Sequence, residues 1–167
     1  MRHEISTMDT PLGPIVWAER DGTLRALEFA DRARGLRARL AKHAGKDATF
    51  VNAPARGPIA DRLRAYFAGD VASLARIRVE ADGTPFQRRV WAALRRIPAG
   101  RTASYREIAE AVGKPTAVRA VGAANGANPI AVVVPCHRVI GADGSLVGYG
   151  GGLARKKWLL RHEGARE

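Results

Sequence analysis

The sequence predicts an α+β protein in which a small N-terminal α/β domain precedes a mainly helical C-terminal domain. In the first half, short stretches of alternating apolar and polar residues flank an Asp21-Gly22 pair, which is typical of an antiparallel sheet with hairpin turns. In the second half, apolar residues recur at helical spacing behind helix-capping residues. The stretch ADGTP at 81–85 separates the two patterns, so we expect domains at 1–82 and 83–167.

The N-terminal half alternates between strand and helix patterns, with turn or stop signals between them. The predicted strands cover 3–10, 13–20, 23–30 and 75–83, and the predicted helices cover 31–45 and 58–70. In the first helix, Leu36 and Leu40 stand four residues apart on one face, and Gly45 ends the pattern. These elements predict an antiparallel sheet covered by helices.

The C-terminal half contains four predicted helices, at 85–97, 105–112, 117–127 and 153–164. Thr84 and Ser104 are suited to cap the first two, and Glu107 stands at the capping-box position of the second. The inward stripe expected for the last helix is Leu153, Trp158, Leu159 and Leu160. The apolar run before Pro135 predicts a buried strand.

The helices at 105–112 and 117–127 are joined by the turn GKPT, which is the layout of a helix-turn-helix. The second helix is rich in small residues, which would let it lie close against another surface. They are Ala117, Ala120, Gly122, Ala123 and Ala124. The alternative is a tightly packed helix pair that makes no DNA contact.

The chain carries a net charge of +12 with a pI of about 11.1, which favours a polyanionic partner such as nucleic acid. The alternative is an arginine-rich, solvated surface. The single cysteine excludes an internal disulfide and a Cys-rich zinc site, so we expect no metal. The chain has neither a signal-like apolar segment at its start nor a membrane-length apolar stretch, so we expect a soluble, cytoplasmic protein.

Cys136 is the only thiol of the chain, and it lies in the stretch VVVPCHRVIG between a proline and a histidine. A thiolate is a good nucleophile, and His137 could take the proton of the thiol while Arg138 adds positive charge. Neighbouring side chains on a strand point to opposite faces, which argues against a direct contact between Cys136 and His137. The alternatives are an inert buried cysteine, a core histidine and a structural or surface arginine.

The motif PCHRVIG resembles the active-site motif of the O6-alkylguanine-DNA alkyltransferases, the methylated-DNA–protein-cysteine methyltransferase family. The resemblance runs from about residue 83 to residue 164 and includes the helix pair and the YGGG loop in family order. The N-terminal half is similar only in length and element pattern, including AYFAG. The resemblance implies a ribonuclease H-like N-terminal domain and a helix-turn-helix in the C-terminal domain.

The resemblance also implies a role for individual residues. The implied catalytic residues are Cys136, His137, Glu163, Tyr105 and Asn128. The implied DNA-binding residues are Arg119, Tyr105, Ala117, Val118 and Arg138, and the implied pocket residues are Pro135, Val147, Tyr149, Gly150 and Gly151. Cys136 would accept the alkyl group, and His137 would relay its proton through a water to Glu163. Tyr105 would protonate the departing guanine, Asn128 would brace the turn before the cysteine, and Arg119 would fill the space of the extruded base.

The implied reaction is a single-turnover transfer of an alkyl group from O6-alkylguanine, and also O4-alkylthymine, in double-stranded DNA. The target base must leave the stack, at a cost of a few kcal/mol, before a side chain reaches it. No cofactor and no obligate protein partner are implied. Two alternatives remain: a thiol hydrolase with a Cys-His-Glu set, and a lesion-binding module without transfer.

Overall fold

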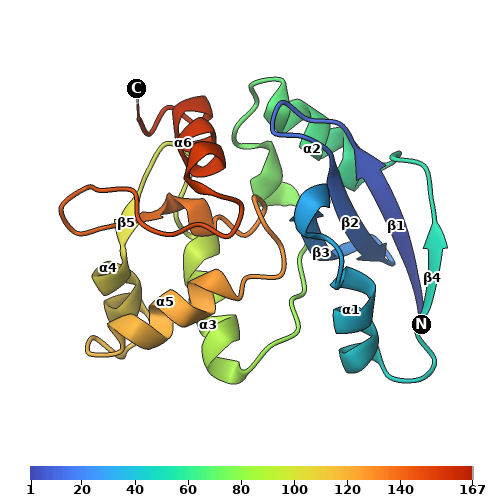
Figure 1. Ribbon diagram of the computed structural model, residues 1–167, viewed down its shortest axis with the longest axis horizontal. Coiled ribbons are helices and arrows are strands. Elements are labelled where there is room, and N and C mark those ends of the chain that lie inside the picture. Colours follow the sequence, from blue (N-terminus) through green and yellow to red (C-terminus); the bar gives the residue numbers. More distant parts are fainter. Residues whose placement is uncertain (167) are drawn as a thin grey trace. The chain divides into compact units, whose positions relative to one another are not determined.

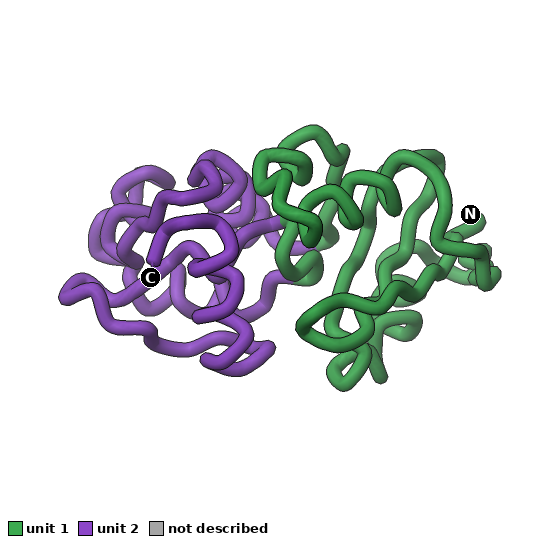
Figure 2. The backbone as a smooth tube through the Cα atoms, turned by 90° about the horizontal axis from the view of Figure 1, so that it is seen from above, with its two compact units in different colours: residues 1–82, 129–133 green, residues 83–128, 134–167 purple. Residues whose placement is uncertain are grey.

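The computed structural model describes residues 1–166 and has a mixed α/β fold. The chain divides into two compact units, coloured separately in Figure 2. Unit 1 comprises Met1–Asp82 and Pro129–Val133, and unit 2 comprises Gly83–Asn128 and Val134–Glu167. Among the described helices, none is long and apolar enough to cross a membrane.

A four-stranded sheet forms the centre of unit 1, in the order β3-β2-β1-β4 (Figure 1). Its strands are β1 (Arg2–Met8), β2 (Ile15–Arg20), β3 (Thr23–Phe29) and β4 (Thr49–Asn52). The first three pair antiparallel, as predicted, and the Asp21-Gly22 turn has the positive φ values of 52° and 77° that such a hairpin requires. Strand β4, which the sequence analysis did not predict, adds to β1 in parallel.

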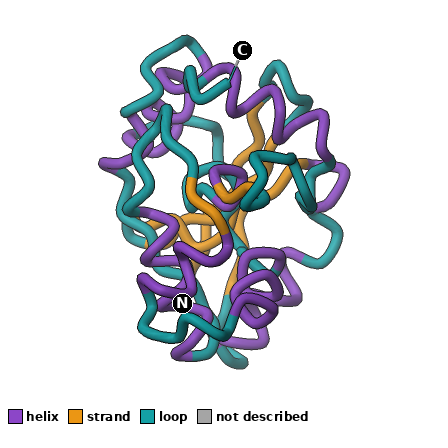
Figure 3. Tube along the Cα trace, turned by 90° about the vertical axis from the view of Figure 1, so that its left-hand side faces the viewer, coloured by secondary structure: helices purple, strands orange, loops and turns teal. Residues whose placement is uncertain are grey.

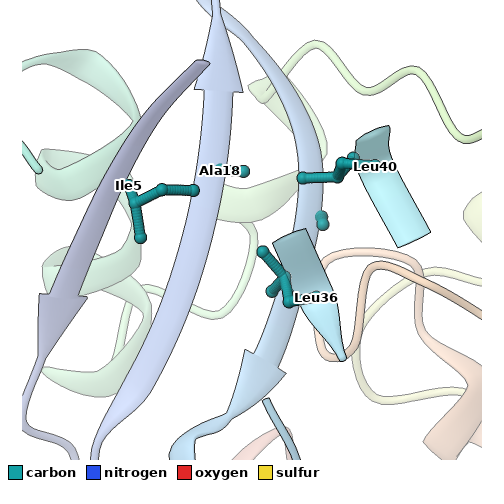
Figure 4. Packing of buried hydrophobic residues seen from close by; sticks show 5 residues of the cluster. Ile5, Ala18, Leu36 and Leu40 are labelled. Carbon is teal, nitrogen blue, oxygen red and sulfur yellow. The ribbon is translucent and has the colours of Figure 1, made fainter. Parts of the chain in front are cut away.

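Helix α1 (Leu36–Ala44) packs on one face of this sheet. Figure 4 shows Leu36 and Leu40 of the helix against Ile5 of β1 and Ala18 of β2. The small side chain of Ala18 lets the helix approach the strands closely. The predicted four-residue stripe is confirmed, although the helix begins five residues later than predicted, after a short 3-10 turn, η1 (Ala30–Arg32).

The predicted strand at 75–83 is wrong. Helix α2 (Pro58–Phe67) is followed by the 3-10 turn η2 (Ser73–Arg76) and then by an extended segment with a single bridge, Leu24 to Val79. The buried Arg25 holds this segment, because its guanidinium pairs with Glu80 at 3.0 Å and Asp82 at 2.8 Å. These ion pairs and two backbone bonds to Leu24 therefore fix a stretch whose alternating sequence is typical of a strand.

Figure 3 distinguishes helices, strands and loops along the chain. The regular structure of unit 2 consists mostly of helices. They are α3 (Pro85–Arg95), α4 (Tyr105–Ala111), α5 (Val118–Gly126) and α6 (Leu153–His162). Both predicted caps are confirmed as full capping boxes, Thr84 with Gln87 and Ser104 with Glu107. The strands β5 (Ala103–Ser104) and β6 (Val139–Ile140) form one short parallel ladder.

The apolar run before Pro135 is buried, as predicted, but it is not a strand. Ile130 makes one bridge to Leu27, and the chain then turns sharply at Val132, whose φ is 69°. A β-branched residue in this region is strained, and the surrounding contacts must hold it there. Backbone bonds supply two of these contacts, from Leu27 N to Pro129 O and from Ala131 N to Leu27 O.

A substitution at Gly83 would test the packing at the start of unit 2. A Cβ at this position would lie 2.5 Å from two ring carbons of Trp91, whose indole N–H donates to Ala124 O at 2.8 Å. Gly83→Ala is therefore expected to lower the free energy of unfolding by about 1–3 kcal/mol in urea titrations. Gly122→Ala is the matched control, because a Cβ there meets nothing within 4 Å, and it should raise stability by about 0.5–1 kcal/mol. Equal stabilities for the two variants would contradict this packing.

Candidate active site

Cys136 begins a single 3-10 turn, η3 (Cys136–Arg138), directly after Pro135. Its side chain is buried, with 7% of the residue exposed, and its N–H donates to Val134 O at 2.8 Å. The three residues of the turn do not alternate as they would on a strand, so the expected separation of Cys136 and His137 onto opposite faces does not apply.

Two asparagines hold the backbone around the cysteine. Asn128 donates from Nδ2 to Val134 O at 2.8 Å, so it joins the two ends of the 129–133 segment. Asn125 donates from Nδ2 to the carbonyl of Cys136 at 3.5 Å. Both asparagines are buried, and the first one occupies the position where a brace before the cysteine was expected.

The carboxylate of Glu163, just beyond α6, is the centre of a buried polar cluster. His137 Nε2 lies 2.8 Å from Oε2 of Glu163. Arg138 donates from Nε to Oε1 at 2.8 Å and from Nη2 to Oε2 at 3.0 Å, the forked geometry that suits a carboxylate. Its Nη1 donates to Ile97 O at 2.6 Å, so the cluster also holds the chain just after α3.

This cluster determines which groups are charged. Burial alone would raise the pKa of Glu163, but bonds and charge from His137 and Arg138 lower it to about 2, so the carboxylate is ionised at neutral pH. Burial lowers the pKa of His137, and the neighbouring Glu163 only partly opposes that effect. The result is a neutral imidazole beside a carboxylate that Arg138 already neutralises.

The neutral form of His137 assigns its two nitrogens. Nε2 carries the proton and donates to Glu163, because an ionised carboxylate only accepts. Nδ1 is then an acceptor, and it is buried without a hydrogen-bond partner within residues 1–166. The residue next to the thiol therefore offers an unused basic nitrogen, which is what a general base requires.

Lys156 is a buried charged residue next to the site, and its role was not predicted from the sequence. It is fully buried in α6, and its Nζ donates to three backbone carbonyls: Val139 at 2.6 Å, Val147 at 2.9 Å and Gly148 at 3.1 Å. Burial lowers the pKa of Lys156 to about 8, although the charge of a Cys136 thiolate raises it. The ammonium thus holds the glycine-rich loop to β6 and favours a negative sulfur.

The spacing of residues in α6 indicates that Lys156 lies on the buried face of the helix. Lys156 lies three and four residues before two fully buried leucines, Leu159 and Leu160, and seven before Glu163, so all four lie on one face. The predicted inward position of Leu153 is wrong, since that residue is 49% exposed, and Trp158 is only half-buried. A charged residue on the apolar stripe marked the site-facing side of the helix.

Tyr105, expected to act in catalysis and DNA binding, and the expected pocket residues occupy different environments. Tyr105, the first residue of α4, donates from its hydroxyl to Val147 O at 3.3 Å. Burial, and then the charge of Cys136, raise the pKa of Tyr105, so the phenol keeps its proton. Tyr149 meets the ring of His137 edge-on at 6.5 Å. Pro135 is buried, Gly151 is half-buried, and Val147 and Gly150 are exposed.

The residues expected to contact DNA separate into two groups. Arg119 and Val118 are exposed in the first turn of α5, and Ala117 is its N-cap. Arg138 is not available for DNA, and that expectation is corrected here. It is buried, and its guanidinium is occupied by Glu163 and Ile97 O.

Comparisons with known proteins identify the family of this chain. Residues 85–165 match the family model described as 6-O-methylguanine DNA methyltransferase, DNA binding domain. A methylated-DNA–protein-cysteine methyltransferase of Salmonella typhimurium is 50% identical over 159 residues, covering 93% of this chain and 92% of the relative. The same-named protein of Mycolicibacterium paratuberculosis is 48% identical, over 96% of this chain and 92% of its own. The crystal structure of Mycobacterium tuberculosis OGT in complex with DNA superposes with a TM-score of 0.82 at 42% identity, covering 97% and 93% of the two chains.

Removing the charge of Glu163 tests the buried cluster. Glu163→Gln leaves Arg138 buried without a counter-charge, so the free energy of unfolding at neutral pH should fall by about 3–5 kcal/mol. Because folding lowers the pKa of Glu163 from 4.5 to about 2, its contribution is present above about pH 4.5 and is lost as the pH falls towards 2. Urea titrations should therefore show a gap between wild type and variant that narrows in acid. Glu110→Gln, at a mostly exposed side chain of α4, should change stability by less than about 0.5 kcal/mol, and a gap independent of pH would contradict the assignment.

Lys156→Met tests the action of the ammonium on the thiol. The variant keeps a long side chain but removes the positive charge, so the midpoint of the pH–rate profile for alkylation of Cys136 by iodoacetamide should move up by about one unit or more. Lys157→Met removes an exposed charge from the adjacent position and should leave the profile unchanged. Identical profiles for the two variants would show that Lys156 acts on the loop alone.

Proposed function

Because the chain belongs to the methylated-DNA–protein-cysteine methyltransferase family, we propose that Cys136 is the acceptor in a direct reversal of DNA alkylation damage. The protein transfers an alkyl group from O6-alkylguanine in double-stranded DNA to a cysteine of its own chain. Cys136 is the only cysteine of the sequence, and it lies beside His137, which bonds Glu163. This single thiol next to a buried base is the observation that carries the proposal.

The thiol loses its proton to Nδ1 of His137 through a water molecule, while Glu163 stabilises the imidazolium that forms. The thiolate then attacks the alkyl carbon from the side opposite O6. A bond forms from Sγ to that carbon as the bond from carbon to O6 breaks, and the electron pair leaves with the guanine. Before the attack, the positive charge of Lys156 stabilises the thiolate of Cys136.

The departing guanine takes a proton from the hydroxyl of Tyr105, and the proton held on His137 restores the phenol. The raised pKa of Tyr105 is consistent with this role, because the donor must stay protonated beside a thiolate. The product is a thioether, which water does not cleave readily. Each molecule therefore acts once, and no cofactor takes part.

DNA binding is assigned to unit 2, with α4 and α5 as a helix-turn-helix. Arg119 is exposed at the start of α5 and enters the base stack, which offsets the stacking lost when the nucleotide is extruded. Ala117 and Val118 lie against the minor groove, where a helix with small side chains fits. Pro135, Val147, Tyr149 and the glycines at 150 and 151 line the pocket for the extruded base, with O4-alkylthymine as a second expected substrate.

The boundary at 82/83 then separates a ribonuclease H-like N-terminal domain, 1–82, from the DNA-binding and alkyl-transfer domain, 83–167, except that the segment Pro129–Val133 lies in unit 1. The match of residues 85–165 to the DNA-binding domain family supports this division of labour. The brace assigned to Asn128 is supported by its bond to Val134 O, two residues before the acceptor.

Mass spectrometry tests the proposal. After mixing with an equimolar duplex that carries one O6-methylguanine, the intact protein should gain one methyl group, on the peptide that contains Cys136. Excess duplex should add no more, and Cys136→Ala should gain none while still binding the duplex. Loss of the lesion without a change in protein mass would point to a turning-over hydrolase. An unchanged lesion with retained binding would leave only a lesion-binding module.

A further inference from the structure

Unit 1 contains an arginine-lined hollow of about 310 Å³ that the alkyl-transfer chemistry does not use. Three segments line it: the β2–β3 turn, the start of α2, and residues 76–78. Arg62, Arg76 and Arg78 contribute to its wall, one from α2 and two from the end of η2 and the segment that follows. We call this feature the arginine hollow.

The backbone that carries the three arginines is firmly held. Ser73 Oγ donates to Arg62 O at 3.0 Å, which ties η2 to α2. Leu24 N donates to Arg78 O at 2.9 Å, which ties the following segment to β3. Ile77, between the other two arginines, is buried with 3% exposed. The three side chains therefore start from fixed points around the hollow.

The charges of the arginine hollow are unbalanced. Within residues 1–166, the guanidinium groups of Arg62, Arg76 and Arg78 have neither an ion pair nor a hydrogen bond. Asp21 is the single carboxylate on the wall, and it is 93% exposed and 3.8 Å from Arg20. Three like charges around one hollow repel one another, and an anion between them removes that cost.

The start of α2 adds to the positive potential. This ten-residue helix begins after Gly57 with Pro58 in its first turn, and no side chain caps it. Its first N–H groups lack intrahelical acceptors and carry the positive end of the helix dipole. Guanidinium forks and free N–H groups together match the oxygens of a phosphate.

We propose that the arginine hollow is a phosphate-binding site, and that a backbone phosphate of the DNA substrate occupies it. The identity of the donor rests on the proposed function, since the protein acts on duplex DNA. The phosphate chemistry rests on the hollow alone. This site belongs to unit 1 and is distinct from the α4–α5 pair of unit 2. It adds affinity for DNA of any sequence, because phosphates carry no base information.

The salt dependence of binding to an unmodified duplex tests this site. Each neutralised phosphate steepens the plot of log affinity against log salt by about 0.9, so losing the one phosphate of the hollow in a double variant, Arg76→Ala with Arg78→Ala, should flatten the slope by about 0.9. Between 50 and 200 mM salt, the affinity of the variant should therefore fall about three- to four-fold less than that of wild type. Arg76→Lys with Arg78→Lys keeps both charges and should retain most of the slope.

The matched control removes two exposed charges of unit 1 elsewhere, Arg2→Ala with Lys46→Ala, and should leave the slope near that of wild type. Equal slopes for the control and the arginine variant would overturn the proposal. Inorganic phosphate is titrated in parallel, with the Nε–H signals of the arginines followed by NMR. Phosphate binding at the hollow combined with an unchanged DNA slope would overturn DNA as the source.

Methyl transfer to Cys136 is measured on the same wild-type sample and separates the two proposals. A flattened slope in the arginine variant, with no methyl gained by wild type, would support the phosphate site and reject the proposed function. Normal methyl transfer by wild type, with equal slopes for wild type and the arginine variant, would support the proposed function and reject the phosphate site.

Discussion

The rest of unit 2 depends on the hydrogen bonds that the buried carboxylate of Glu163 makes with Arg138 and His137. Its two oxygens accept from Arg138 in a fork and face His137, so one side chain after α6 fixes the turn that begins with the only thiol. An ionised carboxylate is costly to bury alone, and its two cationic or polar neighbours remove most of that cost. The same pairing keeps His137 in the form with a basic Nδ1, so stability and chemistry share one cluster.

Helix α6 delivers two charged groups from its buried face. Lys156 and Glu163 stand seven residues apart, with leucines between them, and they hold opposite sides of the site. The ammonium holds the loop carbonyls of Val147 and Gly148, whereas the carboxylate holds the cysteine turn. Neither group reaches solvent, so each must be satisfied by the backbone or by a partner, and this requirement makes the local geometry specific.

Sequence reasoning predicted the elements that depend on local signals. The Asp21-Gly22 hairpin and the capping boxes at Thr84 and Ser104 are decided within a few residues, so their patterns are reliable. It failed for segments whose structure is decided by contacts with residues far away in the sequence. The stretch after η2 alternates like a strand but makes a single bridge and is also held by the ion pairs of Arg25. The run before Pro135 is apolar but turns at Val132.

The residues of the candidate site likewise divide into those that local sequence indicates and those that depend on distant partners. Cys136 and His137 could be singled out as a candidate reactive pair because they are adjacent in the chain, although an inert cysteine and a core histidine remained as alternatives. Their link to Glu163 came only from the family resemblance, since 26 residues separate it from His137. Arg138 was misassigned to DNA because sequence cannot distinguish an arginine that pairs with a buried carboxylate from one that meets a phosphate.

The short segment 129–133 has a consequence for synthesis on the ribosome. It belongs to unit 1 but is translated after α3, α4 and α5. Until it emerges, Leu27 lacks the partners for its backbone N–H and C=O, and the site next to β3 that Ile130 fills stays empty. The N-terminal unit therefore cannot finish folding first, as the usual domain-by-domain order would have it. Unit 1 therefore completes its fold at nearly the same time as Cys136, three residues further along the chain, emerges from the ribosome.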